Sequence, residues 1–371
     1  KKGKILSVLL LSLIVSAQLY PYYTGLVIRD QATGTLYAWN PPDYLWQVAD
    51  VINKGPYENP RILVLPTSGV YVAYNFSPDN VYIGAGFWQT LFEGDVYSSY
   101  FPYNRYSLEW FISIYPTYNF TSYTPLVNVA KLLGINYIII TKNIIPKYFY
   151  PKIEKEKILS IINALPSSLI VYNNSQLVVF NFSSAAIATV PEYIIFINVS
   201  TPLWVPSYPN YNDTVLRMLL VALNLSFVNY SSAALVSSSY EKALLGSIYN
   251  YTTIYRNDSL LVIKINYIPK LKVDVENPSR IIIQVLNYSN DTPIPILIRE
   301  NYQNGVEEHI SGYSKIVPGY SNETFIIIPS SSTIEVDYNS KNILQYIYVI
   351  YFFLALLIMI ALVLIRSNFL R

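Results

Sequence analysis

The sequence contains no cysteine and a single histidine, His309. The absence of cysteine excludes disulfide bonds, thiolate metal sites and a cysteine nucleophile. Protein metal sites use three or four ligands, so His309 beside Glu307 and Glu308 is expected to be a solvated residue of a strand or loop. A Gly-x-Ser-x-Gly elbow, a P-loop and a Rossmann fingerprint are also missing. The sequence therefore predicts no catalytic residue, no metal ion and no cofactor.

Charged residues are scarce as well. They make up 13% of the chain, against about 25% in an average soluble domain. The 25 lysines and arginines nearly balance 23 aspartates and glutamates, and a net charge of +2 gives no reason to expect a nucleic-acid partner. In place of charge the chain has 37 tyrosines and many asparagines and serines. Together with the missing disulfides, this composition suggests an extracytoplasmic archaeal protein from a thermoacidophile.

Long apolar runs occupy both ends of the chain. Residues 346–365 read YIYVIYFFLALLIMIALVLI, the roughly 20 residues that cross a bilayer core. The run Ile5–Ala17 follows three lysines and is short for a span, so it also resembles the apolar part of a signal peptide. Its apolar and aromatic character continues to Tyr23, which favours a retained helix. We predict transmembrane helices over residues 1–23 and 343–371, the second including a short cytoplasmic tail.

The flanking charges predict the topology. Basic residues lie on the outer side of each apolar run, so the positive-inside rule places both termini in the cytoplasm and residues 24–342 outside it. The protein is then expected in the cell membrane, with the lipid bilayer as a partner. A first residue other than Met suggests a fragment, a processed product or part of a larger multi-pass protein.

The extracytoplasmic segment is rich in N-glycosylation acceptors of the form Asn-x-Ser/Thr. An Asn- and Ser-rich chain also produces such sequons by chance, but thirteen lie in this segment and none in the apolar ends. We therefore predict covalently attached N-glycans. The acceptors are Asn75, Asn119, Asn173, Asn181, Asn198, Asn212, Asn224, Asn229, Asn250, Asn257, Asn287, Asn290 and Asn322.

Residues 24–185 are expected to form an extracytoplasmic α/β domain. Residues 61–66 and 136–141 read as buried strands, and the helix predicted between them, at 125–133, suggests that they pair in parallel. Two apolar runs around Asn-Asn-Ser predict a β-hairpin over 169–180. This domain also contains a long aromatic stretch of irregular pattern.

The remaining chain is expected to form two further units. Residues 186–268 predict a second small α/β unit, with strands at 193–198, 225–228 and 259–265 and helices at 214–223 and 240–248. Residues 269–342 lack helical periodicity and predict a β-sandwich, with strands at 272–275, 281–286, 294–300, 324–328 and 333–336. The predicted fold class is α+β and membrane-anchored: α/β extracytoplasmic domains followed by a β-sandwich, with one transmembrane helix at each end.

Three segments of the first domain carry a family resemblance: residues 20–25 (YPYYTG), 132–140 (LLGINYIII) and 169–174 (LIVYNN). They resemble segments of multi-pass membrane glycosyltransferases of the GT-C class, particularly YfhO-type proteins and their archaeal relatives. The terminal β unit, with 298–302 (IRENY) and 326–329 (IIIP), is similar to the closing sandwich of that family. The resemblance implies the C-terminal extracytoplasmic region of such an enzyme, while the family's catalytic acids lie on a loop after its first transmembrane helix.

Two further features of the sequence are candidate binding sites. The acid-x-acid pattern Glu93-Gly94-Asp95 suits a divalent cation or a lipid-phosphate donor, but we prefer to interpret it as a glycine-containing surface turn, which needs no chemistry. An aromatic cluster offers faces that stack on sugars or settle at lipid headgroups, unless its rings fill the core. Its members are Phe87, Trp88, Phe92, Tyr97, Tyr100, Phe101, Tyr103, Tyr106 and Trp110.

The function expected from these features is that of an N-glycosylated extracytoplasmic module of a membrane protein. The family resemblance points to the non-catalytic C-terminal part of a GT-C-like glycosyltransferase acting on lipid-linked sugars. The alternative is a structural or accessory cell-envelope glycoprotein, a subunit of a membrane or surface complex. In that case other membrane or envelope proteins are its partners.

Overall fold

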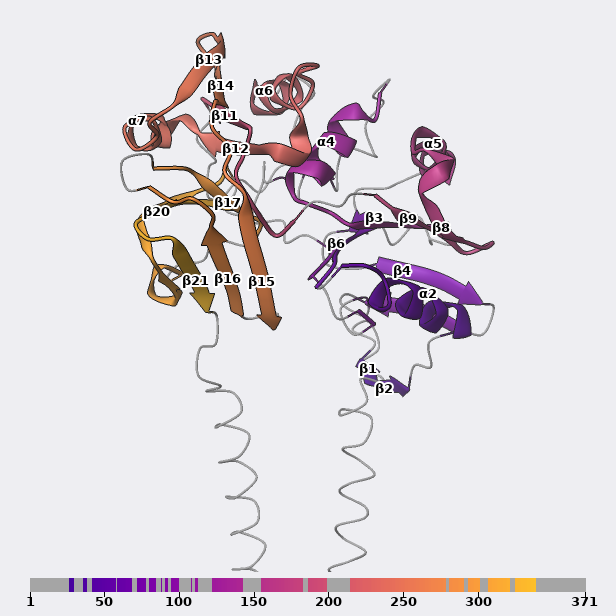
Figure 1. Cartoon of the computed structure of the whole chain (residues 1–371). Helices are drawn as coiled ribbons and strands as arrows, with labels where there is room; N and C mark the ends of the chain where they lie inside the picture. The colour runs from indigo at the N-terminus through magenta and orange to yellow at the C-terminus, as the bar shows by residue number, and fades with distance from the viewer. Residues whose placement is uncertain are drawn as a thin grey trace, which may run out of the picture.

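The computed structural model describes the short strands 27–29 and 36–38 and most of the chain between residues 42 and 337 (Figure 1). Within that span the residues outside the description are 58, 69–71, 78–79, 85–87, 89–90, 93–94, 100–107, 109–110, 113–121, 143–154, 183–185, 199–213, 278–279, 290–292, 301–305 and 321–323. The described residues form four sheets of four or five strands, two hairpins and five α-helices. The hairpins are β1(Val27–Arg29) with β2(Leu36–Ala38), and β4(Val72–Ser77) with β5(Asn80–Gly84).

Sheet 1 belongs to the first predicted domain. Its strand order is β6(Asp95–Ser99), β3(Arg61–Ser68), β7(Tyr137–Thr141), β9(Leu177–Asn181) and β8(Ile170–Asn173). In Figure 1, α2(Asp43–Asn53) lies on one side of this sheet, and α4(Thr124–Leu132) and α5(Lys155–Ala164) lie on the other. Covered on both faces, β7 is buried throughout, which explains its continuous apolar run. The predicted parallel pairing of 61–66 with 136–141 and the predicted hairpin are confirmed.

Sheet 2 has the order β12(Ala233–Ser237), β11(Tyr193–Ile197), β14(Leu260–Ile265) and β13(Tyr251–Arg256). β11 and β12 are parallel, and α6(Thr214–Ala222) lies between them in the chain. The strand predicted at 225–228 is wrong: these residues turn, and β12 begins later. The helix predicted at 240–248 is shorter, because α7(Glu241–Leu245) ends before Gly246, a poor helix former.

The C-terminal strands form two antiparallel sheets. Sheet 3 has the order β10(Ala188–Thr189), β17(Ile296–Ile298), β20(Phe325–Pro329) and β19(Tyr313–Pro318). Sheet 4 has the order β15(Leu271–Asn277), β16(Arg280–Val285), β21(Thr333–Asp337) and β18(Ile310–Ser311). Short 3-10 turns complete the described chain: η4(Ser167–Leu169), η5(Tyr230–Ser232), η6(Ser238–Tyr240) and η7(Val306–His309).

Sheet 3 is the middle layer of a stack, with sheet 2 on one face and sheet 4 on the other. On β20, Phe325 and Ile327 belong to the core shared with sheet 4. The alternate residues Ile326 and Ile328 belong to the core shared with β11 and β14 of sheet 2. The same three layers follow one another in Figure 1. Within the span 269–342 predicted as a β-sandwich, sheets 3 and 4 face each other across one core, but sheet 3 also takes β10 from the preceding segment and packs its other face on sheet 2.

The predicted fold class needs correction. The longest described helix, α2, has 11 residues, about half of what a bilayer span requires. No described helix is both long and apolar enough to cross a membrane. The two predicted transmembrane helices, at 1–23 and 343–371, lie outside the described residues. The described chain is a mixed α/β fold of stacked sheets and short helices, and the prediction of an α+β fold with a transmembrane helix at each end is wrong for it.

The end of α6 is held by the buried side chain of Tyr230. Its hydroxyl donates to the carbonyl oxygen of Ala222 at 2.7 Å and accepts the backbone N–H of Leu225 at 2.9 Å. These bonds turn the chain where a strand was predicted. Burial raises the pKa of Tyr230 to about 12, although the hydrogen bond from Leu225 acts in the opposite direction.

Replacing Tyr230 by phenylalanine should lower the free energy of unfolding by about 1–3 kcal/mol, because both backbone partners lose their bond. The folded protein holds the phenolic proton more tightly than the unfolded chain, so the contribution is complete below pH 10 and is lost as the pH rises through about 12. Denaturant titrations of both proteins across this range should show their stability difference shrinking. A difference that stays constant with pH would contradict this account of Tyr230.

Candidate functional site

The candidate glycosylation sites lie at the surface wherever their side chains are described. Seven of the eight described acceptors are exposed and Asn181 is half-buried. By contrast, the two buried asparagines in the described chain, Asn128 and Asn136, belong to no sequon. The exposed acceptors are Asn173, Asn198, Asn224, Asn229, Asn250, Asn257 and Asn287. Of the other predicted acceptors, Asn75 lies in β4 without a described side chain, and Asn119, Asn212, Asn290 and Asn322 lie outside the described residues.

Local hydrogen bonds shape several of these sequons. The Oδ1 atom of Asn229 accepts the backbone N–H of Ser231, and that of Asn257 accepts the N–H of Ser259 at 2.9 Å. In such Asx turns the asparagine carbonyl holds the hydroxyl residue of the sequon close to the acceptor. The side-chain oxygen is engaged, and the nitrogen Nδ2 is the atom that carries an N-linked sugar.

In an open α/β sheet, ligands usually bind at the carboxyl ends of the parallel strands. In sheet 2 these are the carboxyl ends of β11 and β12. Here Asn198 follows β11, and its Oδ1 accepts a hydrogen bond from Ser238 Oγ at 3.3 Å, just after β12. Asn198 Nδ2 donates to the carbonyl oxygen of Asp258 at 3.2 Å. This edge thus presents amides and hydroxyls together with a glycosylation acceptor, and a glycan on Asn198 would occupy it.

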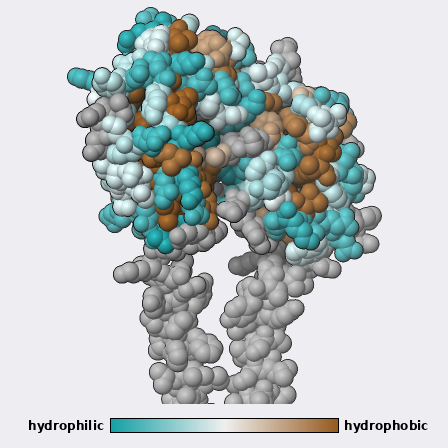
Figure 2. Space-filling model, in the orientation of Figure 1, coloured by the Kyte–Doolittle hydropathy of each residue, from teal (hydrophilic) through white to brown (hydrophobic). Residues whose placement is uncertain are grey.

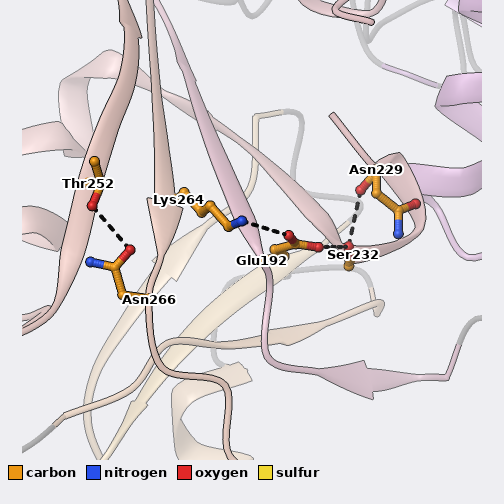
Figure 3. Close-up of polar contacts among 6 residues, drawn as sticks. All are labelled: Glu192, Asn229, Ser232, Thr252, Lys264 and Asn266. Atoms are coloured by element: carbon orange, nitrogen blue, oxygen red, sulfur yellow. Dashed lines mark hydrogen bonds and ion pairs between the residues drawn. The ribbon is translucent and has the colours of Figure 1, made fainter. Parts of the chain in front are cut away.

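The opposite edge of sheet 2 holds an ion pair. Figure 3 shows Lys264 beside Glu192, with Nζ and Oε1 3.4 Å apart, and Ser232 Oγ donating to Glu192 Oε2 at 3.4 Å. The ammonium of Lys264 also lies 5.8 Å from the centre of the Tyr193 ring. These partly exposed groups connect the ends of three strands, and a pair of this kind contributes at most about 1 kcal/mol. Ser232 Oγ contacts Glu192 and the carbonyl oxygen of Asn229, whereas a histidine is the usual base that activates a serine nucleophile.

The acidic candidates from the sequence are only partly described. Glu93 and Gly94 lie outside the described residues, and Asp95 begins β6 opposite Arg61 of β3. His309 is half-buried at the end of η7, beside the exposed Glu307 and Glu308. Among the described residues, no group of three or more His, Cys, Asp or Glu side chains could hold a metal ion.

The aromatic cluster belongs to the core where it is described. Trp88, Phe92 and Tyr97 are all buried, and the rings of Trp88 and Phe92 stack with their centres 6.0 Å apart. Buried rings cannot receive a sugar, so these three residues do not form an open glycan-binding platform. The remaining members, Phe87, Tyr100, Phe101, Tyr103, Tyr106 and Trp110, lie outside the described residues.

Two buried arginines form a cluster that sequence reasoning missed. Arg299, which is 0% exposed, donates from Nη1 to Ala186 O at 2.5 Å, from Nη2 to Ser231 O at 2.5 Å and from Nε to Leu132 O at 3.3 Å. Arg61 Nη1 donates to Leu133 O at 2.5 Å. Both guanidinium groups therefore meet the carboxyl end of α4, where the helix dipole is negative.

The electrostatics of Arg299 reflect its position. Burial, and to a smaller extent the nearby positive charge of Arg61, lower the pKa of its guanidinium to about 9. Its three backbone acceptors come from the end of α4, the segment before β10 and η5, so this side chain joins sheets 1, 2 and 3. The only signal in the sequence is a charged residue directly after the apolar run 294–298. The cluster is a structural junction.

Comparisons with known proteins found no match to any protein family, to any curated protein or to any solved structure.

Proposed function

We propose that this chain is an N-glycosylated extracytoplasmic module of a membrane protein, and that it is the non-catalytic C-terminal part of a GT-C-like glycosyltransferase acting on lipid-linked sugars. The proposed N-glycosylation rests on the exposure of the acceptor asparagines. Seven of eight described sequon asparagines are exposed, although asparagines outside sequons are found in the core of the same protein. Glycans need exposed acceptors, so this distribution favours their use.

The surface chemistry supports a location outside the cytoplasm. Hydrophilic residues cover much of the face seen in Figure 2, with apolar residues in patches between them. Only 13% of the chain is charged, so neutral amides and hydroxyls supply much of this polarity. Surface charge keeps most proteins apart in solution, and this surface has little of it. Attached glycans would hydrate the surface in its place.

The arrangement of polar groups supports a non-catalytic role for this chain. The described residues contain no cluster of metal ligands, and the edge of sheet 2 at which open α/β sheets usually bind ligands carries the acceptor Asn198. The assignment to a GT-C-like enzyme rests on the family resemblance, whose segments 132–140 and 169–174 build the end of α4, β7 and β8. A helper module of such an enzyme would need a stable scaffold and no reactive groups of its own.

The same observations favour a second candidate, a structural or accessory glycoprotein of the cell envelope. A scaffold of stacked sheets with acceptors at the ends of many elements would suit a protein whose glycans shield it while it contacts neighbours. The two candidates differ in the native protein. A glycosyltransferase requires a polytopic chain with an acidic loop after its first span, whereas an accessory glycoprotein does not.

Glycopeptide mass spectrometry of the protein isolated from its native membrane tests the proposal. We expect glycans on most of the seven exposed acceptors, because each presents its amide to solvent. The unmodified residues Asn128 and Asn136 serve as internal controls. A protein whose sequons are all unmodified would overturn the extracytoplasmic assignment. A native chain that lacks further apolar spans and an acidic loop after the first span would overturn the glycosyltransferase candidate.

A further inference from the structure

A groove of about 330 Å³ lies between the end of α7, the end of β14 and the connection from β16 to β17. Its floor is apolar and consists of Ile248, Ile265 and Ile294, each buried. Tyr249 and Tyr267, which are 72% and 45% exposed, also line it. None of its lining residues is charged. The volume is in the range of small-ligand sites, and the lining suits a neutral ligand with apolar faces.

Two glycosylation acceptors, Asn250 and Asn287, belong to the wall of this groove. The sequon of Asn250 is held by a neighbouring asparagine, Asn266, which follows β14. Asn266 Nδ2 donates to Asn250 Oδ1 at 2.8 Å. Asn266 Oδ1 accepts a hydrogen bond from Thr252 Oγ1 at 3.1 Å, as Figure 3 shows. Asn266 thus contacts both defining residues of the sequon Asn250-Tyr251-Thr252, and it fixes the carbonyl side of the acceptor amide.

We propose that the N-glycan on Asn250 folds back into this groove and packs its first sugars on Tyr249 and Tyr267. The inference rests on the proposed glycosylation. Aromatic faces stack on the apolar faces of sugar rings, and the exposed Tyr249 is the sequence neighbour of the acceptor. Because the sugar is attached to the wall of the groove, its effective concentration there is high, and even weak stacking is sufficient to hold it.

This arrangement gives the exposed tyrosines a role. Large exposed aromatic rings beside an apolar floor are otherwise a liability for association with other proteins. A glycan lying in the groove would cover the exposed rings of Tyr249 and Tyr267 without an ion pair or a protein partner. It would also connect sheet 2 with the segment that joins sheets 4 and 3.

Hydroxyl-radical footprinting of the full-length glycosylated protein tests the inference. In the Asn250→Gln variant, labelling of Tyr249 and Tyr267 should rise about twofold or more over the wild type, because a stacked sugar covers about one face of a ring. Asn224→Gln is the matched control: it removes an exposed acceptor that is not part of the groove, and labelling of both tyrosines should stay unchanged. Thermal unfolding of each variant verifies that it is folded.

Glycopeptide analysis of the same samples separates the two proposals. A glycan on Asn250 combined with equal labelling in wild type and Asn250→Gln overturns the groove assignment and leaves the proposed function intact. An unmodified Asn250 among other modified acceptors does the same. If Asn287→Gln, and not Asn250→Gln, uncovers the tyrosines, the assignment to Asn250 is wrong. Only unmodified sequons throughout would overturn both proposals.

Discussion

Replacing Arg299 by alanine should lower the free energy of unfolding by about 3–5 kcal/mol, the largest single effect that we expect in this protein. The guanidinium satisfies three backbone carbonyls that come from different parts of the chain. Alanine leaves all three without this donor and opens a cavity at a fully buried position. Chemical denaturation monitored by fluorescence or circular dichroism measures the change.

Two variants provide controls for Arg299. Arg280 lies on sheet 4 and pairs with Glu335 at 2.6 Å, but both side chains are more than one-third exposed, so Arg280→Ala should cost less than about 1 kcal/mol. The Arg299→Lys variant keeps the charge, but its ammonium lacks the planar set of N–H donors that reaches all three carbonyls. Its free energy of unfolding should therefore lie between those of the wild type and Arg299→Ala. If Arg299→Ala and Arg280→Ala cost the same, the junction assigned to Arg299 is wrong.

Shortening adjacent side chains on β20 should destabilise the protein equally on both faces. Ile326→Ala and Ile327→Ala should each cost about 2–5 kcal/mol, because Ile326 packs toward sheet 2 and Ile327 toward sheet 4. In a two-layer sandwich, one of two consecutive strand residues faces solvent and tolerates the change. The comparison therefore tests whether sheet 3 is a middle layer.

Strand β16 of sheet 4 offers the matched comparison. Ile283 is buried in the core shared with sheet 3, whereas its neighbour Ile282 is half-buried. Ile283→Ala should cost as much as either β20 variant, and Ile282→Ala about 1 kcal/mol or less. If the denaturation midpoint of Ile326→Ala is as high as that of Ile282→Ala, sheet 2 does not stack on sheet 3.

Local pattern predicted the individual strands better than the sheets they form. The apolar runs at 136–141 and 324–328 are both strands, because continuous burial selects branched apolar residues whichever sheet covers them. At 225–228 the pattern failed, since the hydroxyl of Tyr230 binds the N–H of Leu225 and favours a turn. The aromatic cluster failed for a related reason: composition does not distinguish a ring in the core, such as Trp88, from one on the surface.

The candidate glycosylation sites could be predicted from the sequence because a sequon is a three-residue pattern. Their geometry could not. The hydrogen bond from Asn266 to Asn250 depends on the pairing of β13 with β14, and the groove beside it needs the connection from β16 to β17. Nothing in the local sequence marks Tyr249 and Tyr267 as different from the other tyrosines of this chain.

The sequence by itself determined the positions of most strands, the acceptor asparagines, and the absence of cysteine chemistry and of a second histidine. Each of these depends on residue identity or on neighbours within a few positions. The tertiary structure decided which faces of the sheets are covered and where Arg299 places its charge. Arg299 and Leu132 are 167 residues apart in the chain, and only tertiary packing, which places α4 beside η5 and β12, brings a carbonyl within reach of that guanidinium.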